Sequence, residues 1–127
     1  MTLMKDFAWL ALAGAVGTVS RYALSGWAQR LGGERFPWGT LSVNLAGCFL
    51  FGLVFALAEE RFVIPGRLRL IILTGFMGAF TTFSTFSFET AGMLRDDQWL
   101  PALANVTVQN VGGIALVLLG FAAARML

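Results

Sequence analysis

Apolar residues fill four long stretches of this chain, and polar residues or turn formers separate them. The stretches cover residues 7–29, 36–58, 70–93 and 98–124. Each is long enough for a helix of about 20 residues, which a hydrocarbon core about 30 Å thick requires. No stretch alternates apolar and polar positions as a barrel strand would. The pattern predicts an all-α integral membrane protein, with four transmembrane helices in a single domain over residues 1–127.

Composition supports this class and leaves no room for a soluble domain. The 127 residues are 57% hydrophobic and 13% charged, whereas ordinary soluble domains carry about 25% charged residues. The sequence has no histidine and one cysteine, Cys48, which excludes imidazole metal sites, histidine proton relays and an intrachain disulfide. We expect a multi-pass protein of the cell inner (plasma) membrane, in contact with lipid and not with nucleic acid.

Basic residues are divided almost evenly between the two sides of the membrane. Four spans place both termini on one side, together with the loop between the second and third spans. That side carries Lys5, Arg61, Arg67, Arg69 and Arg125, and the other carries Arg30, Arg35 and Arg95. Positive residues orient membrane proteins, so this weak bias permits insertion both ways round and hence an antiparallel dimer. One fixed orientation with cytoplasmic termini also fits the count.

The third stretch contains rings and hydroxyls that a purely lipid-facing helix does not need. Phe80, Phe83 and Phe86 recur every third residue, so neighbouring rings share one helix face. Packing between helices is the ordinary role of such rings. The alternative is that the positive edge of a phenyl ring meets an anion in a pore. Hydroxyls fill the gaps, at Thr81, Thr82, Ser84, Thr85 and Ser87.

Gly78, followed by Thr81 and Thr82, predicts that the third helix breaks within its span. Glycine weakens a helix, and free backbone carbonyls inside a membrane are tolerated only where protein or an ion satisfies them. In an antiparallel dimer, two such breaks would meet at the centre and hold a cation. A simple kink, with hydroxyls satisfying the backbone, is the alternative.

Amide side chains occur deep in the second and fourth stretches. Asn44 offers two N–H donors, which serve either to join helices or to solvate an anion. Asn105, Gln109 and Gly113 follow at four-residue spacing and therefore share one helix face. Because polar groups in lipid are costly unless they face a neighbour or water, we favour a polar track on this face over simple contacts between helices.

Arg21 and Glu89 are the charges that lie deepest in the predicted spans. Ionisable residues inside a membrane are functional candidates by default. An ion pair between the two is the structural alternative.

Several motifs lie within these spans. The first span has Gly14-Ala-Val-Gly17 and Ser20-Arg21-Tyr22, and the second has Pro37-Trp-Gly39-Thr40, Val43-Asn44 and Gly47. The third has Thr74-Gly75-Phe-Met-Gly78, the highly specific string Thr81-Thr-Phe-Ser-Thr-Phe-Ser87, and Glu89. Together they resemble the Fluc (CrcB-type) fluoride channels of bacteria and other microbes over nearly the whole chain. The fourth span departs from many relatives, which have tyrosine and serine where Asn105 and Gln109 stand.

The resemblance implies a dual-topology (antiparallel) homodimer with two fluoride pores and a structural Na⁺ at its centre. In that arrangement Phe83, Phe86 and Asn44 line the pore, and the backbone carbonyls of Gly78 and Thr81 hold the Na⁺. The rest of the ion path is expected along Thr40, Thr82, Ser84, Asn105, Gln109, Arg21 and Glu89.

The implied function is passive, fluoride-selective export that relieves fluoride toxicity, without enzymatic activity. Neutral HF enters a cell and dissociates at the higher internal pH, and the trapped anion then needs an exit. Small dual-topology multidrug transporters are a second class, but they use a buried carboxylate in the first span, and this chain has no acid between Asp6 and Glu34. A non-conducting membrane assembly subunit is a third, which leaves the clustered amides and hydroxyls unexplained.

Overall fold

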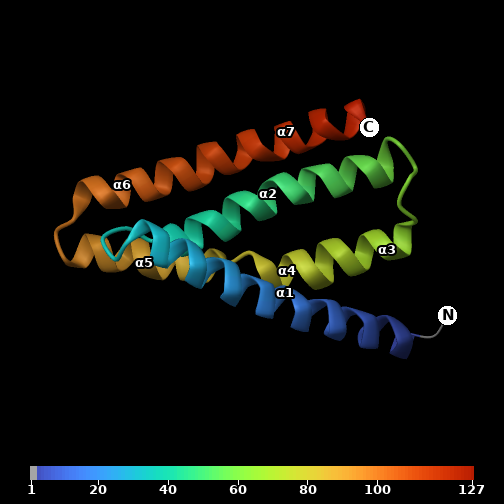
Figure 1. Cartoon of the computed structure of the whole chain (residues 1–127), viewed down its shortest axis with the longest axis horizontal. Helices are drawn as coiled ribbons and strands as arrows, with labels where there is room; N and C mark the ends of the chain where they lie inside the picture. Colours follow the sequence, from blue (N-terminus) through green and yellow to red (C-terminus); the bar gives the residue numbers. More distant parts are fainter. Residues whose placement is uncertain (1–2) are drawn as a thin grey trace.

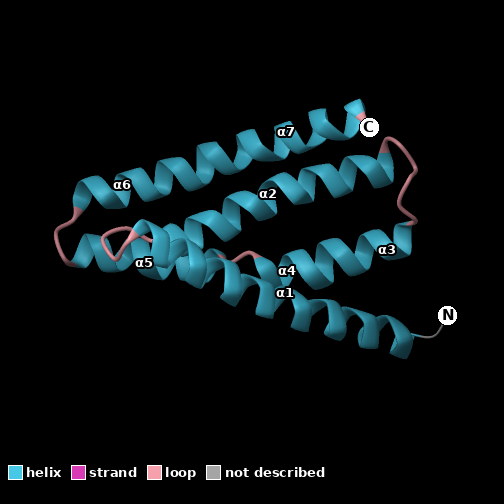
Figure 2. Cartoon of the chain, in the orientation of Figure 1, coloured by secondary structure: helices cyan, strands magenta, loops and turns pink. Residues whose placement is uncertain are grey.

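Four long helices account for nearly all of residues 3–127, which the computed structural model describes (Figures 1 and 2). Each is long and apolar enough to cross a membrane. They are α1 (Leu3–Gly32), α2 (Trp38–Glu59), a segmented third helix (Gly66–Arg95) and a segmented fourth helix (Trp99–Met126). The prediction of an all-α, multi-pass membrane protein is confirmed.

A short turn joins α1 to α2, and the side chain of Gln29 holds it together. Its Nε2 donates to the carbonyl oxygens of Gly33 and Phe36 at 2.6 and 2.9 Å. Its Oε1 accepts from the backbone N–H of Gly39 at 3.0 Å. Gly33 has a φ of +85°, a left-handed conformation that glycine adopts without strain. The turn therefore fixes where α2 begins, and with it the depth of the polar residues on α2.

The third helix is interrupted in the middle of its span. Its segments are α3 (Gly66–Leu70), the π-helical η1 (Ile71–Met77), α4 (Gly78–Phe80) and α5 (Phe83–Arg95). Between α4 and α5 the backbone of Thr81 and Thr82 is extended, with φ/ψ of −91°/158° and −149°/106°. The interruption appears as a short loop between these two segments in Figure 2. The break predicted from Gly78 and the paired threonines is present.

The fourth helix also contains a π-helical segment. It runs through α6 (Trp99–Thr107), η2 (Val108–Gly112) and α7 (Gly113–Met126). The last of these packs along α2 (Figure 1). A Cβ on Gly120 would lie 2.6 Å from the backbone nitrogen of Leu53, so a small residue is needed for this close approach.

A small hydrophobic core lies beside the break. Val43 of α2 packs there with Met77 and Phe80 of the third helix, and all three are buried. The Phe80 ring stacks on Phe76, with centroids 5.4 Å apart and an interplanar angle of 16°. Phe80 is thus a packing residue, although it belongs to the same three-residue repeat as Phe83 and Phe86.

The start of α1, the end of α7 and the α2–α3 connection lie at one end of the bundle (Figure 1). Ion pairs join neighbouring helices at this end: Asp6 with Arg67 at 2.8 Å, Glu60 with Arg125 at 3.1 Å, and Glu59 with Arg69. Partly exposed pairs of this kind each contribute about 0–1 kcal/mol. They connect the helix ends without determining the fold.

Candidate ion pathway

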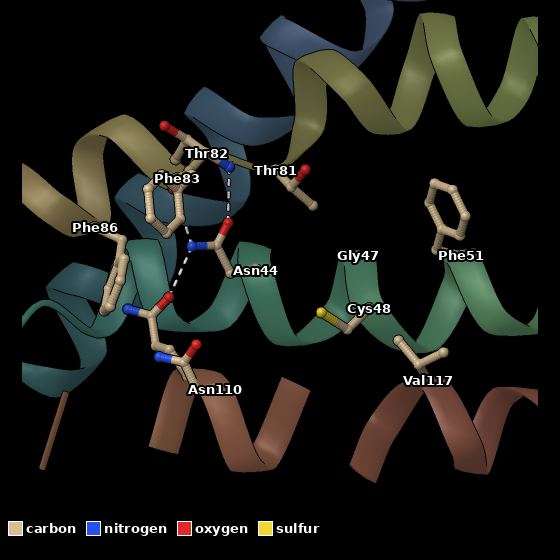
Figure 3. Close-up of a pocket in the computed structure, with 11 residues that line it drawn as sticks. Asn44, Gly47, Cys48, Phe51, Thr81, Thr82, Phe83, Phe86, Asn110 and Val117 are labelled. Carbon is tan, nitrogen blue, oxygen red and sulfur yellow. Dashed lines mark hydrogen bonds between the residues drawn. The ribbon is translucent and has the colours of Figure 1, made fainter. Parts of the chain in front are cut away.

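A cavity of about 280 Å³ lies where α2 passes the break in the third helix (Figure 3). Its walls come from α2, the break with the start of α5, and the fourth helix. The lining residues are Asn44, Gly47, Cys48, Phe51, Thr81, Thr82, Phe83, Phe86, Gln109, Asn110 and Val117. None of these residues is charged, so polarity in this first cavity comes from amides, hydroxyls, backbone groups and aromatic rings.

Asn44 bridges the first cavity and pairs with the backbone at the break. Its Oδ1 accepts from the Thr82 N–H at 2.7 Å, and its Nδ2 donates to the Thr82 carbonyl at 3.1 Å (Figure 3). The same Nδ2 donates to Gln109 Oε1 at 2.7 Å. Unpaired backbone groups are costly inside a membrane. The amide therefore stabilises the extended residue by taking both of its backbone hydrogen bonds.

The Thr82 N–H is diverted away from the end of the preceding helix. In an unbroken helix that N–H would donate to the Gly78 carbonyl, but here it donates to Asn44. Gly78 is exposed, and a Cβ built on it would meet nothing within 4 Å. The N–H and Oγ1 of Thr81 instead both donate to the Met77 carbonyl, at 3.1 and 3.0 Å. Oxygen ligands suit hard cations, so this helix end fits the predicted cation.

Phe83 and Phe86 form an aromatic pair on the wall of the first cavity. Their centroids are 5.6 Å apart and their planes meet at 51°. Phe86 is buried, whereas Phe83 is 77% exposed. Because the edge of a phenyl ring is positive, tilted rings here can present electropositive hydrogens to an anion.

The hydroxyl of Thr82 caps α5 at the same place. It accepts from the Thr85 N–H at 3.3 Å and donates to Thr85 Oγ1 at 2.9 Å. Ser84 Oγ lies 3.4 Å away from it, on an exposed residue. Ser84, which the sequence placed on the ion path, does not line the first cavity.

The two amides predicted on one face of the fourth helix are in contact, because Gln109 Nε2 donates to Asn105 Oδ1 at 2.9 Å, but only one of them reaches the first cavity. Gln109 lines the first cavity, while Asn105 is fully buried behind it. Gly113 is also buried, and a Cβ on it would lie 3.2 Å from Cys48 Sγ. Asn110 lines the first cavity next to Gln109. Its Nδ2 donates to the Val106 carbonyl of its own helix at 2.7 Å.

A second cavity of about 660 Å³ lies between α1, α2 and α5. Arg21, Thr40 and Glu89 line it, and Thr82 lines both cavities. Thr40 Oγ1 donates to Glu89 Oε1 at 2.8 Å, and Glu89 Oε2 is buried without a hydrogen-bond partner among the described residues. Arg21 forms no ion pair with Glu89 in residues 3–127, so the ion-pair alternative is wrong for this chain. The two polar cavities meet at the break.

Comparison with known proteins identifies the family. A model described as CrcB-like protein, Camphor Resistance (CrcB), matches residues 8–121, which include both cavities and the break. This chain belongs to the CrcB-like family. Its similar relatives include proteins named "Fluoride-specific ion channel FluC". The one from Nitrosococcus oceani is 57% identical over 98% of this chain and 100% of its own. Those from Solidesulfovibrio magneticus and Maridesulfovibrio salexigens are 48% and 45% identical, each over 98% of this chain and over 100% and 98% of their own.

In this CrcB-like protein the predicted pathway residues form two groups. Those around the first cavity are Asn44, Phe83, Phe86 and Gln109, and those around the second are Arg21, Thr40 and Glu89, with Thr82 between them. Sequence reasoning missed Thr90, whose Oγ1 donates to the Phe86 carbonyl at 2.8 Å and accepts from Asn105 at 3.0 Å. Thr90 follows Phe86 by four residues, which is one helical turn, and it lies on α5 shortly before the turn to α6. This spacing was the signal available in the sequence.

Proposed function

We propose that this CrcB-like protein is a fluoride-selective channel that lets F⁻ leave the cell passively across the plasma membrane. The observation that carries the proposal is the uncharged cavity at the break, which combines the Phe83 and Phe86 rings with amide donors. The relatives named as fluoride-specific channels support the choice of ion. Such a channel makes and breaks no covalent bond, so the protein is not an enzyme.

The lining suits a small and strongly hydrated anion. Fluoride must exchange its water shell for close hydrogen-bond donors, and it must also bind weakly enough to leave. A fixed cationic side chain would hold the ion, whereas ring edges and amide N–H groups attract it without a full opposing charge. Export follows from chemistry: HF that dissociates inside the cell leaves F⁻ with an outward gradient.

Reconstituted protein in liposomes loaded with fluoride tests this function. With an ionophore to balance charge, a fluoride electrode should record efflux far faster than from empty liposomes, while matched chloride-loaded liposomes should release little. Fluoride efflux equal to that of empty liposomes would contradict the proposal. The remaining candidates would then be a multidrug transporter or a non-conducting membrane assembly subunit. Against the transporter, no acidic residue lies in α1 after Asp6.

The functional unit we propose is an antiparallel homodimer with two pores. One chain leaves the break on an open face, since Gly78 and Phe83 are exposed there. Among the described residues of α1 only Gly17 is buried, so this apolar helix also offers surface for a second copy. Two breaks facing one another would bring the carbonyls of Gly78 and Thr81 from both chains around one Na⁺. Replacing Na⁺ by N-methylglucamine should then lower the melting temperature of the purified dimer.

Labelling from one side of the membrane tests the dual orientation. A single cysteine at the exposed α1–α2 turn, Glu34→Cys in a Cys48→Ala background, is treated in sealed liposomes with a membrane-impermeant maleimide. We expect about half of the chains to react before detergent is added, because each antiparallel dimer presents one such turn outward. Randomly inserted parallel dimers would also give reaction of half the chains. The labelled dimers are therefore cross-linked and their labels counted. An antiparallel dimer carries one label, whereas dimers with two labels or none would contradict the antiparallel arrangement.

A further inference from the structure

A continuous chain of hydrogen bonds runs from the break in the third helix to the Phe86 carbonyl. Its first link is the Thr82 N–H to Asn44 Oδ1 at 2.7 Å, and its second is Asn44 Nδ2 to Gln109 Oε1 at 2.7 Å. Gln109 Nε2 then donates to Asn105 Oδ1 at 2.9 Å, and Asn105 Nδ2 donates to Thr90 Oγ1 at 3.0 Å. Finally, Thr90 Oγ1 donates to the Phe86 carbonyl at 2.8 Å. We call these links the amide relay.

The two ends of the amide relay dictate its direction. A backbone N–H can only donate and a backbone carbonyl can only accept. With Thr82 N–H at one end and the Phe86 carbonyl at the other, each amide between them is confined to one orientation. Along the relay every amide oxygen accepts from the Thr82 side and every amide nitrogen donates toward the Phe86 side, and Asn44 Nδ2 also donates back to the Thr82 carbonyl. Turning any one amide over would set two donors or two acceptors against each other.

This direction decides which group Gln109 offers to the first cavity. Its Oε1 is taken by Asn44 and one Nε2 hydrogen is taken by Asn105. An amide nitrogen carries two hydrogens, and no hydrogen bond among residues 3–127 uses the second. Both Asn44 hydrogens are already donated, to Thr82 and to Gln109. Gln109 therefore keeps a free N–H on a cavity-lining side chain, whereas Asn44 keeps none.

We propose that Thr90 and Asn105 are positioning residues, which set the preference of the first cavity for anions by holding the Gln109 amide with its N–H available to the ion. The inference rests on the proposed fluoride conduction. Neither residue lines that cavity: Asn105 is 0% and Thr90 9% exposed. A buried amide that loses its partner pays the desolvation cost of an unsatisfied group. Without Thr90 Oγ1, Asn105 must turn or shift, and the Gln109 amide loses one of the two partners that hold its N–H toward the cavity.

Substitutions at Thr90 that separate shape from hydrogen bonding test this role. Thr90→Val keeps the shape and removes the hydroxyl, whereas Thr90→Ser keeps the hydroxyl and removes a methyl group. The relay predicts near-normal fluoride flux for Thr90→Ser and flux lower on the order of tenfold for Thr90→Val, the equivalent of about one hydrogen bond. A packing role predicts the opposite order. The matched control is the same pair at Thr107, an exposed residue of α6 outside the amide relay, where neither change should alter the flux.

Non-additivity provides a second readout that a general loss of stability would not give. Asn105→Leu alone and Asn105→Leu with Thr90→Val should conduct equally poorly, because both break the same relay. A ratio of Thr90→Ser to Thr90→Val flux near or below one overturns the inference. If Thr90→Val does not elute as wild-type protein does, Thr90→Ala replaces it, since alanine and serine also differ by one hydroxyl. Absence of wild-type fluoride flux would instead refute the proposed function, so the two failures are distinguishable.

Discussion

Phe83→Ile or Phe86→Ile should reduce fluoride flux through the reconstituted protein by at least about tenfold, which corresponds to about 1.4 kcal/mol. Isoleucine retains the hydrophobic bulk of the site but has no ring edge. The Phe83 and Phe86 rings line the first cavity with centroids 5.6 Å apart. Loss of either ring removes electropositive hydrogens that no aliphatic group replaces. The measurement is fluoride efflux from liposomes that contain equal amounts of protein.

Phe88→Ile is the matched control for this experiment. Phe88 lies on the same helix and is 79% exposed, but it lines neither of the two cavities. Its replacement should leave both flux and elution volume unchanged. If all three variants conduct as the wild type does, the rings serve packing alone, and the electropositive edges play no part in conduction.

Asn44→Leu should lower both flux and stability, with a loss in the free energy of unfolding of about 2–5 kcal/mol. Asn44 makes three hydrogen bonds, two with the backbone of Thr82 and one with Gln109. Leucine has a similar size but leaves the Thr82 N–H and carbonyl unpaired within the span. Thermal melts of the purified protein measure the change.

The stability control for Asn44 is a second amide that touches the same cavity. Within residues 3–127, the side chain of Asn110 makes one hydrogen bond, to the Val106 carbonyl of its own helix. Asn110→Leu should therefore change the free energy of unfolding by no more than about 0.5 kcal/mol. Equal destabilisation by Asn44→Leu and Asn110→Leu would mean that Asn44 does not hold the break together.

Local chemistry made the spans and the break predictable from the sequence. Uninterrupted apolar length defines a membrane helix, and Gly78 with the two threonines weakens the helix where it stands. The roles of individual residues depended on partners that periodicity does not reveal. Phe80 shares the spacing of Phe83 but packs on Phe76. Across η2, a π-helical segment widens the turn, and Asn110 lines the first cavity beside Gln109, while Gly113 packs beside Cys48 of the same cavity.

The Arg21–Glu89 alternative failed for a similar reason. The similar depth of Arg21 and Glu89 suggested that the two charges would pair. In the described residues 3–127, however, Thr40 donates to one Glu89 oxygen, and Arg21 lines the second cavity without an ion pair to Glu89. Thr90 was missed because its partner on α6 is brought near by a helical hairpin and lies 15 positions along the chain. Contacts between helices, rather than the helices themselves, are what a single sequence leaves undetermined.

The two-residue break also has an electrostatic consequence for the centre of the membrane. Aligned peptide dipoles give a helix about half a positive charge at its N-terminus and half a negative charge at its C-terminus. The helical run that begins at Gly66 ends at Phe80, and α5 begins at Phe83. An uninterrupted span would place these poles only at its ends, near water. The break places one of each polarity at mid-membrane, so a single chain can attract an anion and a cation within a few ångströms without any charged side chain.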